Sequence, residues 1–213
     1  MKQTLLIFDL DGTLLDTGNQ ISRALSNVLT RKSFGAITFE KIQSKIGLPL
    51  QIMLEQLEIP FEIQSEIAIE FREDLKRDML GGIPVFGGVE DFLRNAVDQK
   101  CVLGIATSKP THLAELAVEA SALRNFEFII KGTDDVNAKP RPDVIHRVIG
   151  AAKNFEHPTM FGDRIEDMQA AINAQIRGIG LAQGAHSTKE LLEAGASKAF
   201  MSFGELLHSD WHS

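Results

Sequence analysis

The sequence predicts an α/β fold, in which a doubly wound parallel sheet carries an inserted α-helical unit. Three observations predict this fold. An apolar run of strand length occupies residues 4–10, strand-like and helix-like segments alternate from about residue 88 onward, and residues 17–82 show helical periodicity without convincing strands. We therefore expect an α/β core formed by residues 1–16 and 83–213, with residues 17–82 as an inserted helical cap.

The core elements are expected in regular alternation. Strands that alternate with helices are typical of a parallel sheet with right-handed crossovers, and the first strand belongs to the same sheet by its composition. The further strands are expected at residues 101–107, 126–131, 157–162, 176–181 and 197–200. Helices are expected at residues 88–99, 110–122, 142–153, 164–174, 187–194 and 203–208.

The cap is expected because apolar residues recur at helical spacing throughout residues 17–82. The chain enters this segment near Asp16-Thr17-Gly18 and leaves it near Gly81-Gly82, and small residues at both crossings suit a hinge. The alternative is that these helices pack permanently on the sheet.

Composition excludes several classes of protein. With 213 residues, 44% of them hydrophobic, the chain can form a sizeable core without disulfides or structural metals. Its single cysteine, Cys101, lies in an apolar run, and we expect a buried strand residue in a reducing compartment. The net charge of −7 without a basic stripe argues against nucleic acid as a partner. We see neither a leader peptide nor an apolar run of membrane-spanning length, and expect a cytoplasmic protein with no membrane partner.

The first strand ends in two carboxylates, Asp9 and Asp11, followed directly by Gly12 and Thr13. Residues two apart on a strand point the same way, so both carboxylates can face one point beyond the strand end. They would repel each other unless a cation or a shared proton intervenes. In one arrangement this repulsion serves catalysis: Asp9 acts as nucleophile and metal ligand, and Asp11 acts as acid and base. The alternative is a plain Asp-Gly turn or helix cap.

Hydroxyl groups follow the next predicted strand at Thr107 and Ser108, just before Pro110 opens a helix. A hydroxyl together with backbone N–H groups at a helix start can bind phosphate oxygens. A simple helix cap is the alternative, and it is compatible with phosphate binding.

A rigid loop carries Lys139, which Pro140 and Pro142 follow closely. The two prolines leave the loop little conformational freedom to lose. The ammonium of Lys139 would then neutralise a phosphoryl oxygen or reduce the repulsion near Asp9. An isolated lysine would otherwise be an ordinary surface residue.

Another apolar run ends in Gly162 and is followed by Asp163 and Asp167. If a helix starts after Asp163, the carboxylate of Asp167 faces back toward the strand ends. Carboxylates that converge there would hold Mg²⁺, which prefers oxygen ligands. The alternative is that both acids stabilise a helix start through its dipole.

Taken together, these motifs resemble those of the haloacid dehalogenase superfamily, in its phosphoglycolate phosphatase-like branch with a helical cap and a Rossmann-like core. Phe8–Leu14 reproduces the first motif of the family in full. Thr107, Lys139 and Gly162–Asp163 with Asp167 fall where its second, third and fourth motifs belong. The return from the cap departs from the pattern, because Phe86 stands where a proline is usual.

The resemblance implies a Mg²⁺-dependent phosphatase that acts on a small phosphomonoester. Asp9 would form an aspartyl-phosphate, and Asp11 would protonate the leaving alcohol and then activate water. Thr107 and Lys139 would complete the catalytic set, and Gly12 and Ser108 would contact the substrate. The resemblance implies metal binding by Asp9, Asp163, Asp167 and the backbone carbonyl of Asp11.

Neighbouring activities can be weighed from the same motifs. Asp11 argues against a true dehalogenase, which works without this second acid. A β-phosphoglucomutase-like enzyme is the main alternative, although the segment expected to hold its second phosphate, Gly47–Leu50, has no cation and only Lys45 lies nearby. A binding protein that has lost turnover is a further alternative.

Substrate identity and several other features are not predicted by the sequence. Any of several cap cations could bind a substrate carboxylate, namely Arg23, Arg31, Lys41, Lys45, Arg72, Lys76 and Arg77. The six histidines show no metal-ligand spacing, and the oligomeric state is not predicted. For the C-terminal tail with Trp211 we favour a frayed end over a docked one.

Overall fold

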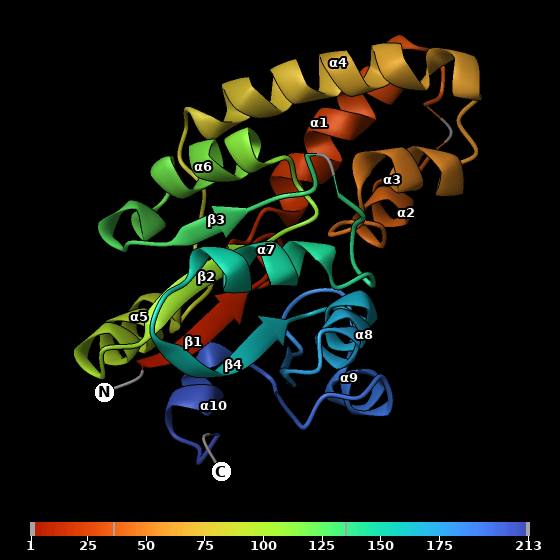
Figure 1. Cartoon of the computed structure of the whole chain (residues 1–213). Coiled ribbons are helices and arrows are strands. Elements are labelled where there is room, and N and C mark those ends of the chain that lie inside the picture. The colour runs from red at the N-terminus through yellow and green to blue at the C-terminus, as the bar shows by residue number, and fades with distance from the viewer. Residues whose placement is uncertain (1–2, 36, 135, 212–213) are drawn as a thin grey trace.

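A six-stranded parallel sheet forms the centre of the molecule. The structure is a computed structural model that describes residues 3–35, 37–134 and 136–211. The strand order is β3-β2-β1-β4-β5-β6, so successive strands move outward in one direction from β1 to β3 and in the other from β4 to β6 (Figure 1). The strands are β1 (Gln3–Phe8), β2 (Val102–Ala106), β3 (Ile129–Lys131), β4 (Phe155–Gly162), β5 (Arg177–Leu181) and β6 (Lys198–Phe200).

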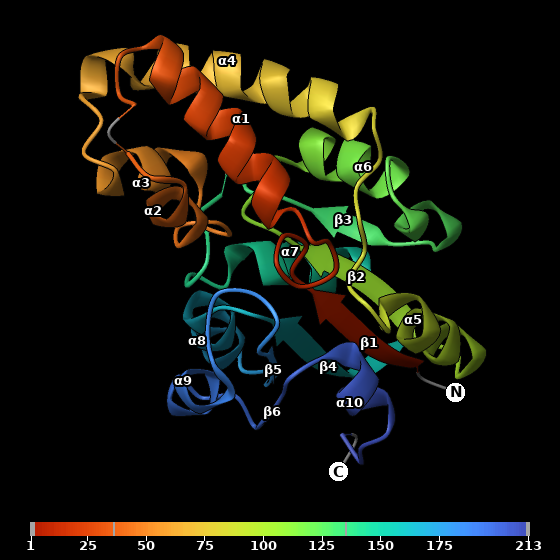
Figure 2. The ribbon, with the colours of Figure 1, turned by 180° about the vertical axis from the view of Figure 1, so that it is seen from behind.

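Helices cover both faces of this sheet, which confirms the predicted doubly wound α/β fold. Helices α5 (Val89–Asp98) and α10 (Phe203–Leu207) lie on one face, whereas α7 (Asp143–Ala151) and α8 (Ile165–Asn173) lie on the other (Figures 1 and 2). Three further elements lie near the two edges of the sheet: α6 (Thr111–Glu119), the 3₁₀ helix η1 (Ala122–Asn125) and α9 (Thr188–Glu193).

Strand β1 shows why its sequence suits the centre of the sheet. Leu5 and Ile7 pack with residues of α7 and α8, while Leu6 and Phe8 pack with residues of α5 and α10. All four side chains are fully buried. A strand between two helical layers needs apolar residues on both faces, which explains a continuous apolar run instead of an alternating one.

The described residues between β1 and α5 form helices joined by turns and loops, and none of them belongs to a strand of the sheet. These helices are α1 (Gly18–Arg31), α2 (Phe39–Gln43), α3 (Leu50–Gln56) and α4 (Phe61–Met79). They gather on the side of the sheet where the strands end, and α1 and α4 lie side by side in both ribbon views. Arg31 on α1 forms an ion pair with Asp74 on α4 at 2.9 Å. The assignment of residues 17–82 as a cap with its own motion stays a prediction.

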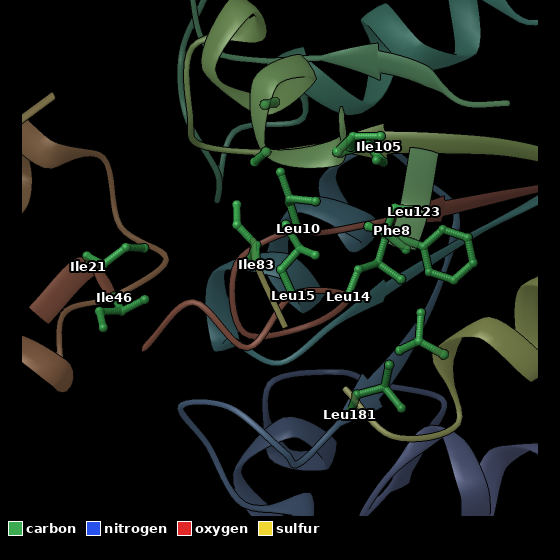
Figure 3. Close-up of a cluster of buried hydrophobic side chains, with 14 of the residues drawn as sticks. Phe8, Leu10, Leu14, Leu15, Ile21, Ile46, Ile83, Ile105, Leu123 and Leu181 are labelled. Atoms are coloured by element: carbon green, nitrogen blue, oxygen red, sulfur yellow. The ribbon is translucent and has the colours of Figure 1, made fainter. Parts of the chain in front are cut away.

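The two connections to this helical segment are hydrogen-bonded to each other. The Asp16 amide donates to the Pro84 carbonyl at 2.9 Å, and the Phe86 amide donates to the Leu14 carbonyl at 3.1 Å. In Figure 3 the side chains of Leu15 and Ile83 lie close together beside these connections. The chain therefore leaves and re-enters the core at a single place.

The expectations of a frayed C-terminal tail and of a buried strand position for Cys101 were wrong. Trp211 is not frayed, because its ring lies 5.6 Å from that of Phe92 and 5.3 Å from that of Phe161, and only 7% of the residue is exposed. The aromatic cluster on this face of the sheet offers the ring an apolar surface that the sequence pattern alone did not indicate. Cys101 lies one residue before β2 and is only partly buried.

Candidate active site

Four charged side chains meet where β1 and β4 end, at the point where the strand order reverses. Asp9 directly follows β1, Asp163 directly follows β4, Asp167 lies in the first turn of α8, and Lys139 lies in the loop before α7. Each of the four is less than 5% exposed. Crevices at such switch points are the usual ligand sites of open α/β sheets.

The three carboxylates lie around one point and share a single ammonium. Each of Asp9, Asp163 and Asp167 offers an oxygen within 4.8 Å of the other two. The Lys139 ammonium donates to Asp9 Oδ1 at 2.6 Å and to the carbonyl of Ala106 at 3.0 Å, and lies 2.5 Å from Asp167 Oδ1. One cation among three buried carboxylates leaves an excess of negative charge.

Burial and this excess of negative charge shift the pKa values of Asp9, Asp163 and Lys139. Burial is the largest cause that raises the pKa of Asp9 to about 8, with Lys139 opposing the shift and Asp167 adding to it. Burial and the charge of Asp167 likewise raise the pKa of Asp163 to about 6. Burial alone would lower the pKa of Lys139, but attraction to Asp167 and Asp9 raises it above its ordinary value.

The arrangement fits a divalent cation. Asp9 Oδ2 is buried and has no hydrogen-bond partner among the described residues. An unpaired buried carboxylate oxygen is costly, and a cation bound among the three acids would remove that cost. An all-carboxylate set of oxygen donors is the kind that hard cations prefer.

Asp163 is held by Thr13 from the first predicted motif and by the chain after β5, which lies outside the predicted motifs. Thr13 Oγ1 donates to Asp163 Oδ1 at 2.8 Å, and the Ala185 amide donates to Oδ2 at 2.9 Å. Gly12 and Gly184 approach the same carboxylate so closely that a Cβ at Gly12 would lie 2.7 Å from Oδ2, and one at Gly184 would overlap it. Gly12, predicted as a substrate contact, therefore lies against Asp163. Gly184 was missed because nothing in its local sequence marks it.

The side chain of Asp11 is turned toward other partners. Thr17 Oγ1 donates to Asp11 Oδ1 at 2.8 Å, and the Lys109 ammonium lies 2.9 Å from Oδ2. Asp11 thus lies beside the three carboxylates of the cluster without joining it. Lys109 was missed as a functional residue, although its place two residues after Thr107 could have drawn attention to it.

The predicted phosphate-binding residues lie at the end of β2. Thr107 is buried, and its hydroxyl accepts from the Lys109 amide at 3.2 Å. The carbonyl of Ser108 accepts from the Thr133 hydroxyl at 2.8 Å. These bonds fix the turn that presents Thr107 and the Ser108 backbone.

A cavity of about 580 Å³ lies between these strand ends and the helical segment. Its core-side wall includes Asp9, Asp11, Thr107, Ser108 and Lys109. The opposite wall is formed mainly by side chains of the helical segment: Ile21, Leu48, Leu50, Gln51, Met53, Phe71, Arg72 and Leu75, with Gly47 and Pro49. A small molecule in the cavity would therefore touch both parts of the chain.

Arg164 joins the core to the helical segment and was also missed. Its amide donates to Asp167 Oδ2 at 3.1 Å, which closes the first turn of α8. Its guanidinium donates to the carbonyl of Ile46 and, at 3.1 Å, to Glu166. Gly47 lies directly on the side chain, because a Cβ there would be 2.5 Å from Arg164 Cδ.

Buried acids and a lysine at the switch point of a parallel sheet are features of an enzyme active site. The model of the haloacid dehalogenase-like hydrolase family matches residues 6–181, and the chain belongs to this family. The resemblance noted in the sequence is thereby confirmed, and the chain is a hydrolase of the phosphatase kind.

Similar proteins extend over nearly the whole chain. "Probable phosphatase IndB" of Dickeya dadantii is 30% identical over 95% of this chain and 91% of its own length. A phosphoglycolate phosphatase of Photorhabdus laumondii is 25% identical over 95% and 90%, respectively. The crystal structure of a hydrolase from Pseudomonas syringae superposes with a TM-score of 0.81 at 28% identity and covers 97% of each chain. Among the described residues, none of the helices has the length and apolar character needed to cross a bilayer.

Proposed function

We propose that the protein is a Mg²⁺-dependent phosphatase that hydrolyses a small phosphomonoester through an aspartyl-phosphate on Asp9. The observation that carries this proposal is the cluster of three buried carboxylates around Lys139, of which Asp9 lines the cavity. The relatives named phosphatases support the same reaction class.

The carboxylates of Asp9, Asp163 and Asp167, with the backbone carbonyl of Asp11, would hold the metal ion. When bound, Mg²⁺ neutralises negative charge at the transferring phosphoryl group and helps to orient it. The excess negative charge of the carboxylate cluster suits a divalent cation.

In the first step a carboxylate oxygen of Asp9 attacks phosphorus, and the bond from phosphorus to the substrate oxygen breaks. The leaving alkoxide takes a proton from Asp11. Lys139, the Thr107 hydroxyl and the Ser108 amide would stabilise the charge that spreads over the phosphoryl oxygens. The contacts of Asp11 with Thr17 and Lys109 hold its carboxyl group beside the cavity.

In the second step water attacks the phosphorus of the aspartyl-phosphate, and Asp11 accepts the proton from that water. Free phosphate leaves, and Asp9 is regenerated as a carboxylate. Splitting a slow hydrolysis into two displacements is the advantage of covalent catalysis. Helices α1–α4 would act as the cap that excludes bulk water during these steps.

The experiment measures phosphate release from a panel that includes 2-phosphoglycolate, AMP and 4-nitrophenyl phosphate, with Mg²⁺ and with EDTA. We expect Mg²⁺-dependent release from the natural sequence and a loss of roughly a thousandfold or more for Asp9→Asn. Asp16→Asn, an exposed acid in the same segment, is the matched control and should retain activity. Equal release from the natural sequence and Asp9→Asn would overturn the proposal.

A further inference from the structure

Only one of the seven cap cations singled out in the sequence lines the cavity. Arg72 on α4 lines the cavity, as do Phe71 and Leu75 of the same helix. Arg31 and Arg77 bind Asp74 away from the cavity. The other four, Arg23, Lys41, Lys45 and Lys76, do not line it.

Arg72 also has no partner in the part of the chain that the structure describes. Within the described residues it forms neither a hydrogen bond nor an ion pair, although it is only partly exposed. The other basic groups in the wall differ, because Lys109 is bound to Asp11 and His112 is exposed. A half-buried guanidinium facing a cavity is therefore free to bind a ligand anion.

Apart from Gln51, the side chains that the helical segment contributes to the wall around Arg72 are apolar. They come from Ile21, Leu48, Leu50, Met53, Phe71 and Leu75. The cavity volume of about 580 Å³ lies within the range of sites that enclose ligands far larger than a two-carbon acid. Such walls favour an apolar body between the two ends of the ligand.

We propose that Arg72 selects phosphomonoesters that carry a carboxylate at the end of an apolar body. This inference rests on the proposed phosphatase function, which places the phosphoryl group at Asp9. A single guanidinium matches a carboxylate in a bidentate pair, whereas a second phosphate would need more cations than the cap wall offers. Arg72 would thus determine specificity without taking part in phosphoryl transfer.

The first test compares 4-carboxyphenyl phosphate with 4-nitrophenyl phosphate, whose nitro group has the same shape without the charge. The two substrates have leaving groups of different reactivity. For each substrate we therefore divide kcat/KM of the natural sequence by that of the variant, and this ratio does not depend on the leaving group. We expect Arg72→Gln to lower kcat/KM roughly tenfold or more on the carboxylate and less than about twofold on the nitro compound. Lys76→Gln, on the same helix but exposed, is the control and should change neither. Equal losses on both substrates for Arg72→Gln would overturn the inference.

A binding experiment separates this inference from the proposed function. Calorimetry in an Asp9→Asn background, with and without Arg72→Gln, needs no turnover. We expect 4-carboxyphenyl phosphate to bind more tightly than both 4-nitrophenyl phosphate and 2-phosphoglycolate. Arg72→Gln should abolish the preference for the carboxylate over the nitro compound.

The outcomes distinguish the two proposals. Preferential binding of 4-carboxyphenyl phosphate, without any turnover by the natural sequence, would overturn the phosphatase proposal alone. Turnover with equal binding of the two aryl phosphates, or tighter binding of 2-phosphoglycolate, would overturn the Arg72 inference alone. If none of the three compounds bound, the Arg72 inference would be overturned as well.

Discussion

At the scale of single residues, Gly184 sets the position of the Asp163 carboxylate. Its Cα lies so close that any Cβ would overlap Asp163 Oδ2. We expect Gly184→Ala to push this carboxylate away from Asp9 and Asp167 and to weaken Mg²⁺ binding by about tenfold or more, as loss of groups around a metal ligand does. Calorimetric titration with MgCl₂ measures the affinity.

The control for this prediction is Gly150→Ala in α7, where an added Cβ meets no atom within 4 Å. That variant should bind Mg²⁺ normally and gain about 0.5–1 kcal/mol of unfolding free energy, because alanine favours a helix over glycine. Unchanged Mg²⁺ affinity in Gly184→Ala would contradict the prediction and show that the loop can shift without moving Asp163.

The raised pKa values of Asp9 and Asp163 predict proton release on metal binding. With pKa values of about 8 and about 6, these groups hold more protons at neutral pH than ordinary carboxyl groups do. A metal ion needs them ionised, so lowering the pH supplies protons that compete with it. We expect Mg²⁺ affinity to rise between about pH 6 and pH 8, with release of about one proton per ion at neutral pH.

Calorimetry in buffers of different ionisation heat measures this release directly. Asp16→Asn should behave as the natural sequence does, since Asp16 is exposed and lies outside the cluster. A pH-independent affinity with no released proton would contradict the prediction.

The residues that sequence reasoning found and missed differ in what surrounds them in the chain. Asp9 and Asp163 could be named because each directly follows an apolar strand. Arg164 could not be assigned a partner, because its contact with Ile46 joins residues 118 positions apart. Gly184 acts through the absence of a side chain beside a distant carboxylate. Such effects depend on tertiary packing, which no local pattern encodes.

At the scale of elements, α8 and the loop before α3 are connected through Arg164. Its side chain supports the Ile46–Gly47 turn, and the next residue, Leu48, lines the cavity. We expect Arg164→Ala to raise KM roughly tenfold, because the turn loses a charge-assisted hydrogen bond that positions the cavity wall. Mg²⁺ affinity should change less than about twofold, since the backbone amide that holds Asp167 remains.

Steady-state kinetics and calorimetry on the same preparation check both halves of this prediction. Arg94→Ala removes an exposed arginine that binds only Glu90 and Asp91 on its own helix among the described residues, and should alter neither value. A parallel loss of Mg²⁺ affinity in Arg164→Ala would mean that the side chain supports the carboxylates and not the turn.

Helices and strands were predictable because burial imposes a period on the sequence. The strand expected at residues 176–181 is observed as Arg177–Leu181. The strand expected at residues 126–131 is shorter, Ile129–Lys131, because Phe126 and Phe128 pack against the core without entering the sheet. Apolar composition marks burial, whereas strand bounds depend on hydrogen bonding to β2.

At the scale of the whole molecule, the strand order accounts for the place of the site. Strands β1 and β4 are neighbours in the sheet, and their pairing sets Phe8 beside Phe161. Because Asp9 and Asp163 follow these two strands, the pairing brings both carboxylates to one edge of the sheet although they lie far apart in the chain. Alternation of strands and helices predicted a parallel sheet but did not determine which strands are neighbours. That choice depends on long-range packing across the sheet.

The docked C-terminal tail extends the core on the face covered by α5 and α10. Figure 1 places α10, which precedes the tail, on the side of the sheet away from α1–α4. Trp211 is the single tryptophan, and its ring packs on Phe92 and Phe161. We expect Trp211→Ala to lower the unfolding free energy by about 3 kcal/mol, because removal of a buried aromatic leaves a cavity in the core.

Urea denaturation followed by circular dichroism measures this loss of stability. Phe61→Ala is the matched control, because Phe61 is 77% exposed and its removal should change the unfolding free energy by less than about 0.5 kcal/mol. Phosphate release per folded molecule should be unchanged in Trp211→Ala, since the tail lies on the far side of the sheet from the cavity. Equal stability of the two variants would mean that the tail contributes no core packing, and the tryptophan would then be a surface residue as its sequence position suggested.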